Sequence, residues 1–337
     1  MTRIISFLGQ RLLFIVPQLF GILLVSFFLI KSIPGDPAVL MLGPMASTDA
    51  VVSLRTKLGL DHALPIQFWH FLVNLVHGDL GTSWQTTRPV LEDLLQRFPA
   101  TLELVTLGLL GAIIIGVPLG VASAFDEKGI LGRVAGVYGL TAGSLPDFWL
   151  ALVLIFVFYT ILQIVPAPLG RLDFAILPPP TISGFLIFDS IAAGDWAALG
   201  SALTHLCLPV LTLSLINAGP ILKMTQSTMD RMLQSDFSRY EVLSGLPHRM
   251  VVRHALRNSL PSIVTIISVL YGYLLGGAVL VEIVFSWGGA GQYAVQGVLN
   301  SDIYPVLGFV LFSAIFSLIV YLIVDIVYVA IDPRIGR

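Results

Sequence analysis

Four carboxylates lie in or beside long apolar stretches of the chain, where ionised side chains are rare. They are Glu103, Asp147, Glu282 and Asp325. A charge at the centre of a bilayer costs about 2.5–3.5 kcal/mol on insertion scales, so each carboxylate is expected to face protein or water instead of lipid. We expect Glu103, Glu282 and Asp325 to have structural roles, as partners of arginine or as caps of helix ends.

Asp147 differs because it lies in the string SLPDFWL, directly after Pro146. A proline removes a backbone hydrogen bond from a helix and frees groups in the preceding turn. A carboxylate that faces an internal cavity at such a place can bind a free amine or another cation. The alternative is a hydrogen-bonded structural aspartate.

Motifs of common catalytic and metal sites are absent. The six histidines include no H-E-x-x-H, there is no G-x-S-x-G, and none of the four lysines follows a glycine as a P-loop requires. The single cysteine, Cys207, excludes an intrachain disulfide, a four-cysteine zinc site and an iron–sulfur cluster. The sequence therefore predicts no catalytic residue, no metal site and no cofactor on this chain.

The most informative polar segment is 224–259, and its first half predicts a short helix that ends in a forced turn. Ser235 is expected to cap this helix. Gly245 follows it, at a position where a positive φ costs little only for glycine, and Pro247 prevents the helix from resuming.

The second half of this segment predicts a basic helix that begins near His248. Arg249, Arg253 and Arg257 recur at intervals of four residues, which places them on one face. Two helices joined by a tight turn predict a rigid projection. The alternative is an ordinary basic loop whose arginines contact lipid phosphates.

The amino-acid composition of the chain indicates the environment in which these residues lie. Of the 337 residues, 56% are apolar and only 11% are charged, whereas a soluble domain has about 45–50% and about 25%. So little polar surface excludes a soluble enzyme, a disordered regulator and a nucleic-acid-binding protein. The chain is predicted to be an all-α polytopic membrane protein.

Six apolar segments are long enough to cross a bilayer, which takes about 20 residues. The first is read as a retained span instead of a signal peptide, because it is long and no cleavage site follows. The six expected spans are about 12–30, 99–125, 134–162, 205–223, 257–282 and 302–331.

An even number of spans puts both termini on one side of the membrane. If that side is the cytoplasm, its segments hold twelve of the 18 lysines and arginines, as the positive-inside rule favours. The other side then carries two long segments, about 31–98 and 163–203. In the first, Phe68, Phe71 and Leu75 recur with helical spacing around Trp69. This predicts an amphipathic helix that packs on the ends of the spans or docks a partner.

The string MTQSTMDRMLQSDFSRYEVLSGLPHRMVVRHALRNSLP (224–261) resembles the cytoplasmic coupling loop of permeases in binding-protein-dependent ABC importers. The subfamily that it resembles is the dipeptide/oligopeptide/nickel one, specifically its B-type permease. The resemblance runs nearly end to end, through RLLFIVPQLFGILLVSFFLIKSIPGDPA (11–38), LGLDHALPIQFWHFLVNLVHGDLGTS (58–83), RFPATLEL (97–104), FSWGGAGQYAVQGVLNSDIYPV (285–306) and VDIVYVAIDPRIGR (324–337).

This resemblance implies six transmembrane helices in the type I ABC importer (MetI-like) permease fold. Residues 1–98 would form the first transmembrane helix and an extracytoplasmic segment with the amphipathic helix. Residues 99–337 would form a five-helix core with the coupling loop at about 224–259. The expected location is the bacterial cytoplasmic (inner) membrane, with both termini in the cytoplasm.

The function implied is that of a permease subunit without enzymatic activity, which forms half of a pathway for di- or oligopeptides. The implied partners are a homologous second permease, two P-loop ATPase subunits that bind ATP and Mg²⁺, an extracytoplasmic substrate-binding protein and membrane lipids, with no nucleic acid. Glutathione, opines and nickel chelates are alternative cargoes. In a different class, an ion-coupled secondary transporter would be expected to show paired broken helices.

Residue roles follow from the same resemblance. Members usually carry a stretch of the type Thr-Ala-Arg-Ala-Lys-Gly before the turn, and here residues 240–245 read YEVLSG, with the glycine kept and the basic character lost. The candidate substrate-pathway residues are Asp147, Phe148 and Glu282. The residues expected to couple to the ATPase are Arg239, Tyr240, Glu241, Leu243, Gly245, Leu246, His248, Arg249 and Arg253.

Overall fold

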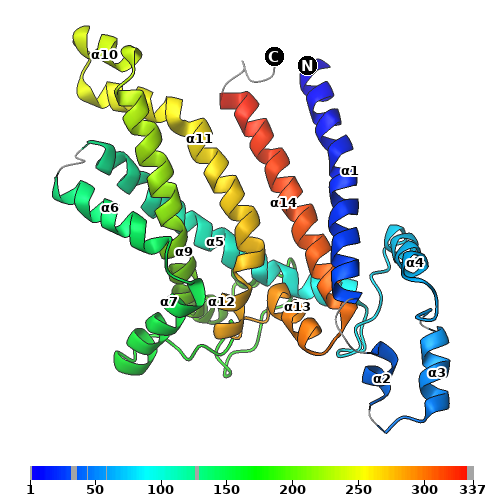
Figure 1. The fold of residues 1–337 in the computed structure, drawn as a ribbon. Coiled ribbons are helices and arrows are strands. Elements are labelled where there is room, and N and C mark those ends of the chain that lie inside the picture. The colour runs from blue at the N-terminus through cyan, green and yellow to red at the C-terminus, as the bar shows by residue number, and fades with distance from the viewer. Residues whose placement is uncertain (1, 32–35, 44, 58, 126–128, 332–337) are drawn as a thin grey trace. The chain divides into compact units, whose positions relative to one another are not determined.

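The computed structural model describes residues 2–31, 36–43, 45–57, 59–125 and 129–331. Within these residues the regular secondary structure is helical, apart from one isolated bridge between Thr82 and Pro89 (Figure 1). The predicted all-α class is therefore confirmed.

Helices occupy all six of the expected spans. Four of them, α5 (Val90–Phe125), α9 (Trp196–Leu233), α11 (His248–Gly277) and α14 (Ile303–Ile331), contain apolar stretches long enough to cross a membrane. The first span corresponds to α1 (Thr2–Lys31), whose described apolar part, Phe14–Phe28, is shorter.

The third expected span is broken instead of continuous. It consists of α6 (Ile130–Ala142) and a second helix made of α7 (Asp147–Leu154) and the π-helical turn η1 (Ile155–Ile161), bent by 109°. The break has a local cause, because Pro146 is extended at the N-cap of α7 and disfavours helix in the residue before it. The polypeptide therefore bends beside Asp147.

Shorter helices connect these long ones. They are α2 (Pro37–Leu42), α3 (Thr48–Lys57), α4 (Leu64–Val76), α8 (Leu186–Ala193), α10 (Asp236–Leu243), α12 (Val279–Val284) and α13 (Ala290–Leu299).

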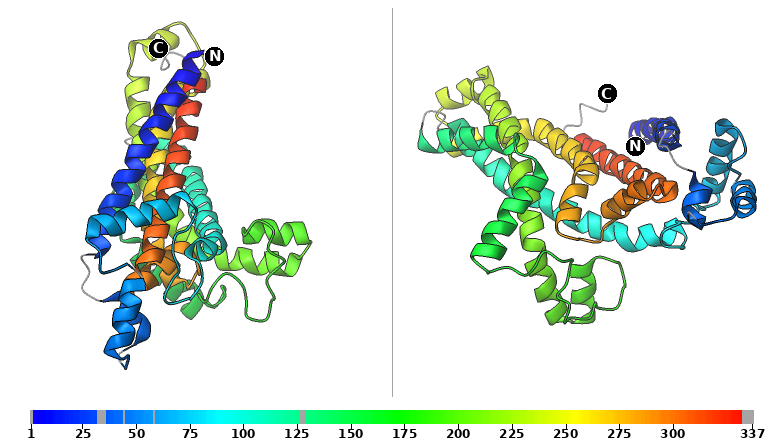
Figure 2. Two further views of the ribbon diagram at one scale, coloured as in Figure 1. Left: turned by 90° about the vertical axis from the view of Figure 1, so that its right-hand side faces the viewer. Right: turned by 60° about the horizontal axis from the view of Figure 1, so that its bottom comes forward.

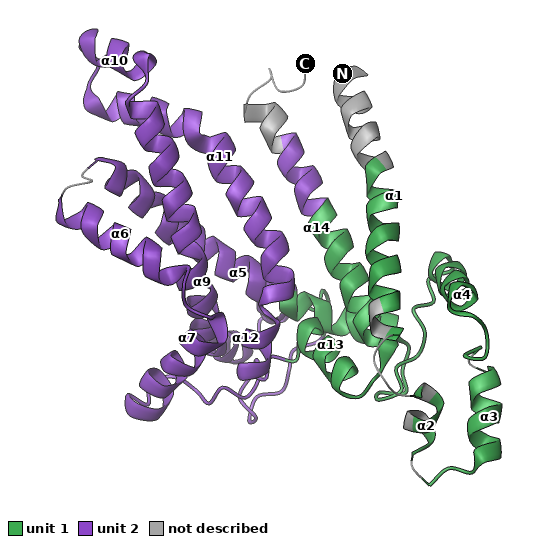
Figure 3. Cartoon of the chain, in the orientation of Figure 1, with its two compact units in different colours: residues 1–101, 181–185, 288–318 green, residues 102–180, 186–287, 319–337 purple. Residues whose placement is uncertain are grey.

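The chain forms two compact units that are each discontinuous in sequence (Figure 3). Unit 1 comprises residues 1–101, 181–185 and 288–318, and unit 2 comprises residues 102–180, 186–287 and 319–337. Residues 288–318 thus belong to the same compact unit as the N-terminal part, and the functional division expected at residue 98 stays a prediction.

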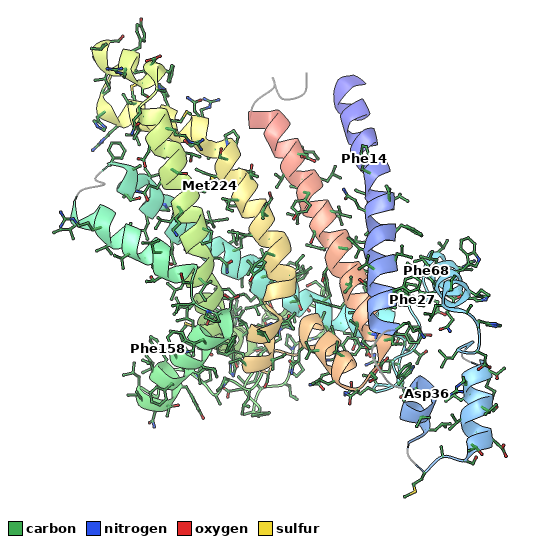
Figure 4. The ribbon with its side chains drawn as sticks, viewed as in Figure 1. Phe14, Phe27, Asp36, Phe68, Phe158 and Met224 are labelled. Atoms are coloured by element: carbon green, nitrogen blue, oxygen red, sulfur yellow. The ribbon has the colours of Figure 1, made fainter. Side chains whose placement is uncertain are left out.

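In unit 1 the expected amphipathic helix is present as α4, and its apolar face packs against α1. The ring of Phe27 lies 5.2 Å from that of Phe68 and 6.0 Å from that of Phe71, between centroids. Trp69, on the other face, is 64% exposed. Of the two interpretations left open by the sequence, packing on a span accounts for the buried face (Figure 4).

In unit 2, α9 is the central helix and packs against α6, α7, α8 and α11 (Figure 2). Glycines on α5 let that helix approach α9 closely. A Cβ on Gly116 would lie 2.8 Å from the carbonyl oxygen of Ala218 and 2.9 Å from Cβ of Ile221. Ser214 of α9 donates a hydrogen bond to the carbonyl of Gly108 at 3.0 Å. Small residues at such contacts drive helix association in membranes.

Replacing Gly116 with alanine is expected to destabilise unit 2 by about 1–3 kcal/mol, because the added methyl overpacks the contact with α9. The matched control is Gly136→Ala on α6, where an added Cβ meets nothing within 4 Å. Thermal unfolding of the purified protein in detergent measures both effects. Equal melting temperatures for the two variants would contradict the close approach of α5 and α9.

Candidate functional site

The loop between α9 and α11 has the local structure that its sequence predicts. The hydroxyl of Ser235 accepts a hydrogen bond from the backbone N–H of Ser238 and caps α10. Gly245 follows this helix with φ of +78°. Pro247 is the N-cap of α11, which begins at His248. A short helix, a glycine turn and a second helix therefore form one continuous motif.

The outer face of α10 is open and carries four large apolar side chains together with the charged Asp236 and Arg239. Tyr240 is 71% exposed and Leu243 is 87% exposed, and Phe237 and Val242 are exposed beside them. Exposed groups of large apolar side chains mark interaction sites. The tip of this loop is thus suited to contact with another molecule.

The basic face of α11 adjoins this apolar tip. Arg249, Arg253 and Arg257 are all exposed, and none of them forms an ion pair within the described part of the chain. The other predicted coupling residues Arg239, Gly245 and His248 are exposed and Leu246 is half-buried.

Glu241 is the one predicted coupling residue that is buried. Only 5% of it is exposed, and its Oε1 lies 2.5 Å from Nδ1 of His254 on α11. Its second oxygen, Oε2, is buried without a hydrogen-bond partner among the described residues. The geometry joins α10 to α11, and it assigns Glu241 to the inner face of the loop instead of its contact surface.

At the break of the third span, Asp147 is the first residue of α7 and is half-buried. Within the described part of the chain the carboxylate makes no hydrogen bond or ion pair. The neighbouring Phe148 is exposed. These two residues present an acidic and an aromatic group at one kink.

Glu282 has different surroundings from Asp147. It lies in α12 and is fully buried, with 0% exposed, and its backbone carbonyl accepts a hydrogen bond from the N–H of Trp287 at 2.8 Å. Glu282 is therefore part of the core of unit 2, and a contact with substrate stays a prediction.

The structural role expected for Glu103 is confirmed. Its Oε2 lies 2.5 Å from an amino nitrogen of Arg171, and its Oε1 accepts a hydrogen bond from the backbone N–H of Ile187 at 2.9 Å. The guanidinium of Arg171 also lies 5.8 Å from the ring centroid of Trp287. This ion pair fixes the segment before α8, and sequence reasoning did not identify Arg171 as its partner.

Comparison with known proteins places the whole chain among transport proteins. Residues 116–337 match the model of the family described as "Binding-protein-dependent transport system inner membrane component", and residues 4–105 match the model of its N-terminal part.

Individual relatives extend over nearly the full chain. A probable D,D-dipeptide transport system permease protein of Escherichia coli is 41% identical over 333 residues, 98% of each chain. A dipeptide transport system permease protein of Alkalihalophilus pseudofirmus is 37% identical over 334 residues, 98% of this chain and 99% of the relative. A glutathione transport system permease protein of Pectobacterium atrosepticum is 35% identical over 334 residues, with the same coverage.

Proposed function

Because the chain belongs to the family of inner-membrane components of binding-protein-dependent transport systems, we propose that it forms half of the translocation pathway of an ATP-driven importer. The observation that carries this proposal is the loop of α10, Gly245 and α11, with its apolar tip and basic face. The chain itself acts by binding and conformational change, and ATP and Mg²⁺ are bound by separate ATPase subunits.

We propose that this loop moves as a rigid body and transmits the motion of the ATPase subunits to the permease. The exposed side chains of Tyr240 and Leu243 enter a cleft on an ATPase subunit, and the arginines of α11 contact its surface. When two ATPase subunits close on ATP, the loops move with them, and the pathway switches between inward- and outward-facing states. Such a mechanism is two-state gating by rigid elements.

The proposed assembly contains a homologous second permease, two P-loop ATPases and an extracytoplasmic substrate-binding protein. Both termini and the coupling loop lie in the cytoplasm, as the distribution of twelve of the 18 basic residues favours. An ion-coupled secondary transporter is the alternative class. Uptake that survives collapse of the proton gradient but stops when ATP is depleted excludes that alternative.

Di- or oligopeptides are the proposed cargo, because the relatives carry the names of dipeptide and glutathione permeases. Asp147 supports a cargo with a free amine, since its carboxylate makes no hydrogen bond or ion pair within the described residues. Of the alternative cargoes glutathione, opines and nickel chelates, glutathione is the one that a relative's name carries. Competition of unlabelled dipeptide and glutathione for uptake of a labelled dipeptide separates the two.

Replacing Asp147 with asparagine is expected to raise the KM for a free-amine dipeptide by roughly tenfold, because a charge-assisted hydrogen bond to the α-ammonium is lost. Uptake of an N-acetylated peptide is the matched control and is expected to be unchanged. The measurement is initial uptake rate against concentration in reconstituted vesicles. An equal KM for the variant and the original protein assigns Asp147 a structural role.

A further inference from the structure

A cavity of about 390 Å³ lies in unit 1, where the end of α1 meets the segment of α3 and α4 and the start of α14. Its apolar wall includes the rings of Phe27, Phe71 and Trp84. Amide side chains of Gln67 and Asn74 also line it. A polar group with an apolar extension fits a cavity of this composition.

The charged groups that line this cavity are two lysines, Lys31 and Lys57, and one acidic side chain, Asp79. The imidazoles of His62 and His70 line it as well and can form hydrogen bonds. Positive charges in a partly enclosed space concentrate the field and attract anions. The cavity is therefore suited to a ligand with negative charge.

These basic side chains lack anionic partners within the described part of the chain. None of the four forms an ion pair or a side-chain hydrogen bond there, and Nζ of Lys31 lies 5.8 Å from the ring centroid of Phe27. The carboxylate of Asp79 accepts a hydrogen bond from the backbone N–H of Gly81 at 2.8 Å. The two lysines and the two imidazoles thus remain available to an added ligand.

The depth of the cavity in the membrane indicates which anion this is. Lys31 follows directly on the apolar run 12–30, and the side chains of Phe14, Val16 and Val25 within that run are exposed, as lipid-facing residues are. A lysine at the end of a span lies at the membrane interface, and so does an exposed tryptophan such as Trp69. Lipid phosphates are found at that depth.

We propose that this cavity binds the headgroup phosphate of an anionic phospholipid, held by Lys31 and Lys57 and by the imidazoles of His62 and His70. The aromatic wall contacts the glycerol and the first acyl carbons. The site needs only the membrane position of α1 and is independent of the proposed coupling mechanism. A bound lipid there would stabilise the α3–α4 segment on α1.

The test is native mass spectrometry of the full chain, with its co-purifying subunits, released from nanodiscs that contain phosphatidylglycerol and phosphatidylcholine. The protein is expected to retain phosphatidylglycerol selectively. Lys31→Gln and Lys57→Gln are each expected to weaken retention roughly tenfold, because a charge-assisted contact to the phosphate is lost. Asp79→Asn is expected to strengthen it, because the acidic group that repels the phosphate is neutralised.

The matched control is Lys223→Gln, which removes another exposed lysine outside the cavity and is expected to leave retention unchanged. The proposal is overturned if phosphatidylcholine is retained equally, or if the cavity variants and the control behave alike. Displacement of the lipid by inorganic phosphate alone would also overturn it, since the site would then be one for free anions. If Lys31→Gln fails to fold, the test rests on the other two variants. Weaker lipid retention by Lys57→Gln and stronger retention by Asp79→Asn then support the proposal, and any other result overturns it.

Discussion

Replacing Gly245 with valine is expected to abolish ATP-driven uptake while the protein still inserts into the membrane. The backbone at this residue has φ of +78°, and an added Cβ would meet nothing within 4 Å. The entire cost is therefore conformational, about 1–3 kcal/mol for a side chain in this region and more for a β-branched one. The turn relieves this strain by changing shape, and α10 then leaves the position from which we propose that it engages the ATPase.

A matched variant separates the effect of distorting the turn from the effect of replacing glycine as such. Gly245→Asn is expected to retain most of the uptake, because asparagine tolerates positive φ better than other side chains. ATP-dependent uptake into proteoliposomes is measured for both variants, with the amount of inserted protein as the reference. Full activity of the valine variant would show that the turn does not transmit the motion of the ATPase.

The second large effect is expected at the pair of Glu241 and His254. Replacing His254 with alanine leaves a buried carboxylate without its partner, which costs about 1–3 kcal/mol or more for a charged group. The helix α10 is then expected to swing away from α11. Uptake is expected to fall at least tenfold, while ATP hydrolysis by the assembled complex continues.

A double-mutant cycle tests whether the pair acts as a unit. Glu241→Ala combined with His254→Ala removes the buried charge together with its partner, so this double variant is expected to transport better than His254→Ala alone. The ratio of cargo transported to ATP hydrolysed is the quantity to compare. If the loss in the double variant equals the sum of the losses in the two single variants, the two residues have independent roles.

The local structure of the loop between α9 and α11 could be predicted from sequence because its signals are short-range. A capping serine, a glycine turn and a proline lie within 13 residues, and each acts on its neighbours. The family was predicted from motifs that run along the whole chain, and the comparisons confirm it. Short-range signals thus predicted the local structure of the loop, and motifs along the chain predicted the family.

The contacts across the fold could not be predicted in the same way. Arg171 and Glu103 are 68 residues apart, and nothing in either segment indicates the partner. Glu241 and His254 lie on two helices, and their contact depends on the angle at which the turn joins them. The burial of Glu241 on the inner face of α10 follows from that angle, whereas sequence reasoning named Glu241 only as a residue expected to couple to the ATPase.

The break of the third span had a signal that hydropathy alone does not use. The stretch 134–162 is apolar enough to be read as one helix, but Gly143 and Pro146 lie inside it. Proline stops the preceding helix, and the chain restarts as α7 at Asp147. Gly143 and Pro146 therefore indicated that this apolar stretch is broken just before Asp147.

The central claim is that this chain is one subunit of an ATP-driven import complex. The most direct test is gentle detergent extraction of the tagged chain from its native host, followed by mass spectrometry of the proteins that co-purify. The account predicts a second six-span permease and one or two P-loop ATPases in stoichiometric amounts. A chain that purifies alone, or only with copies of itself, would contradict the account.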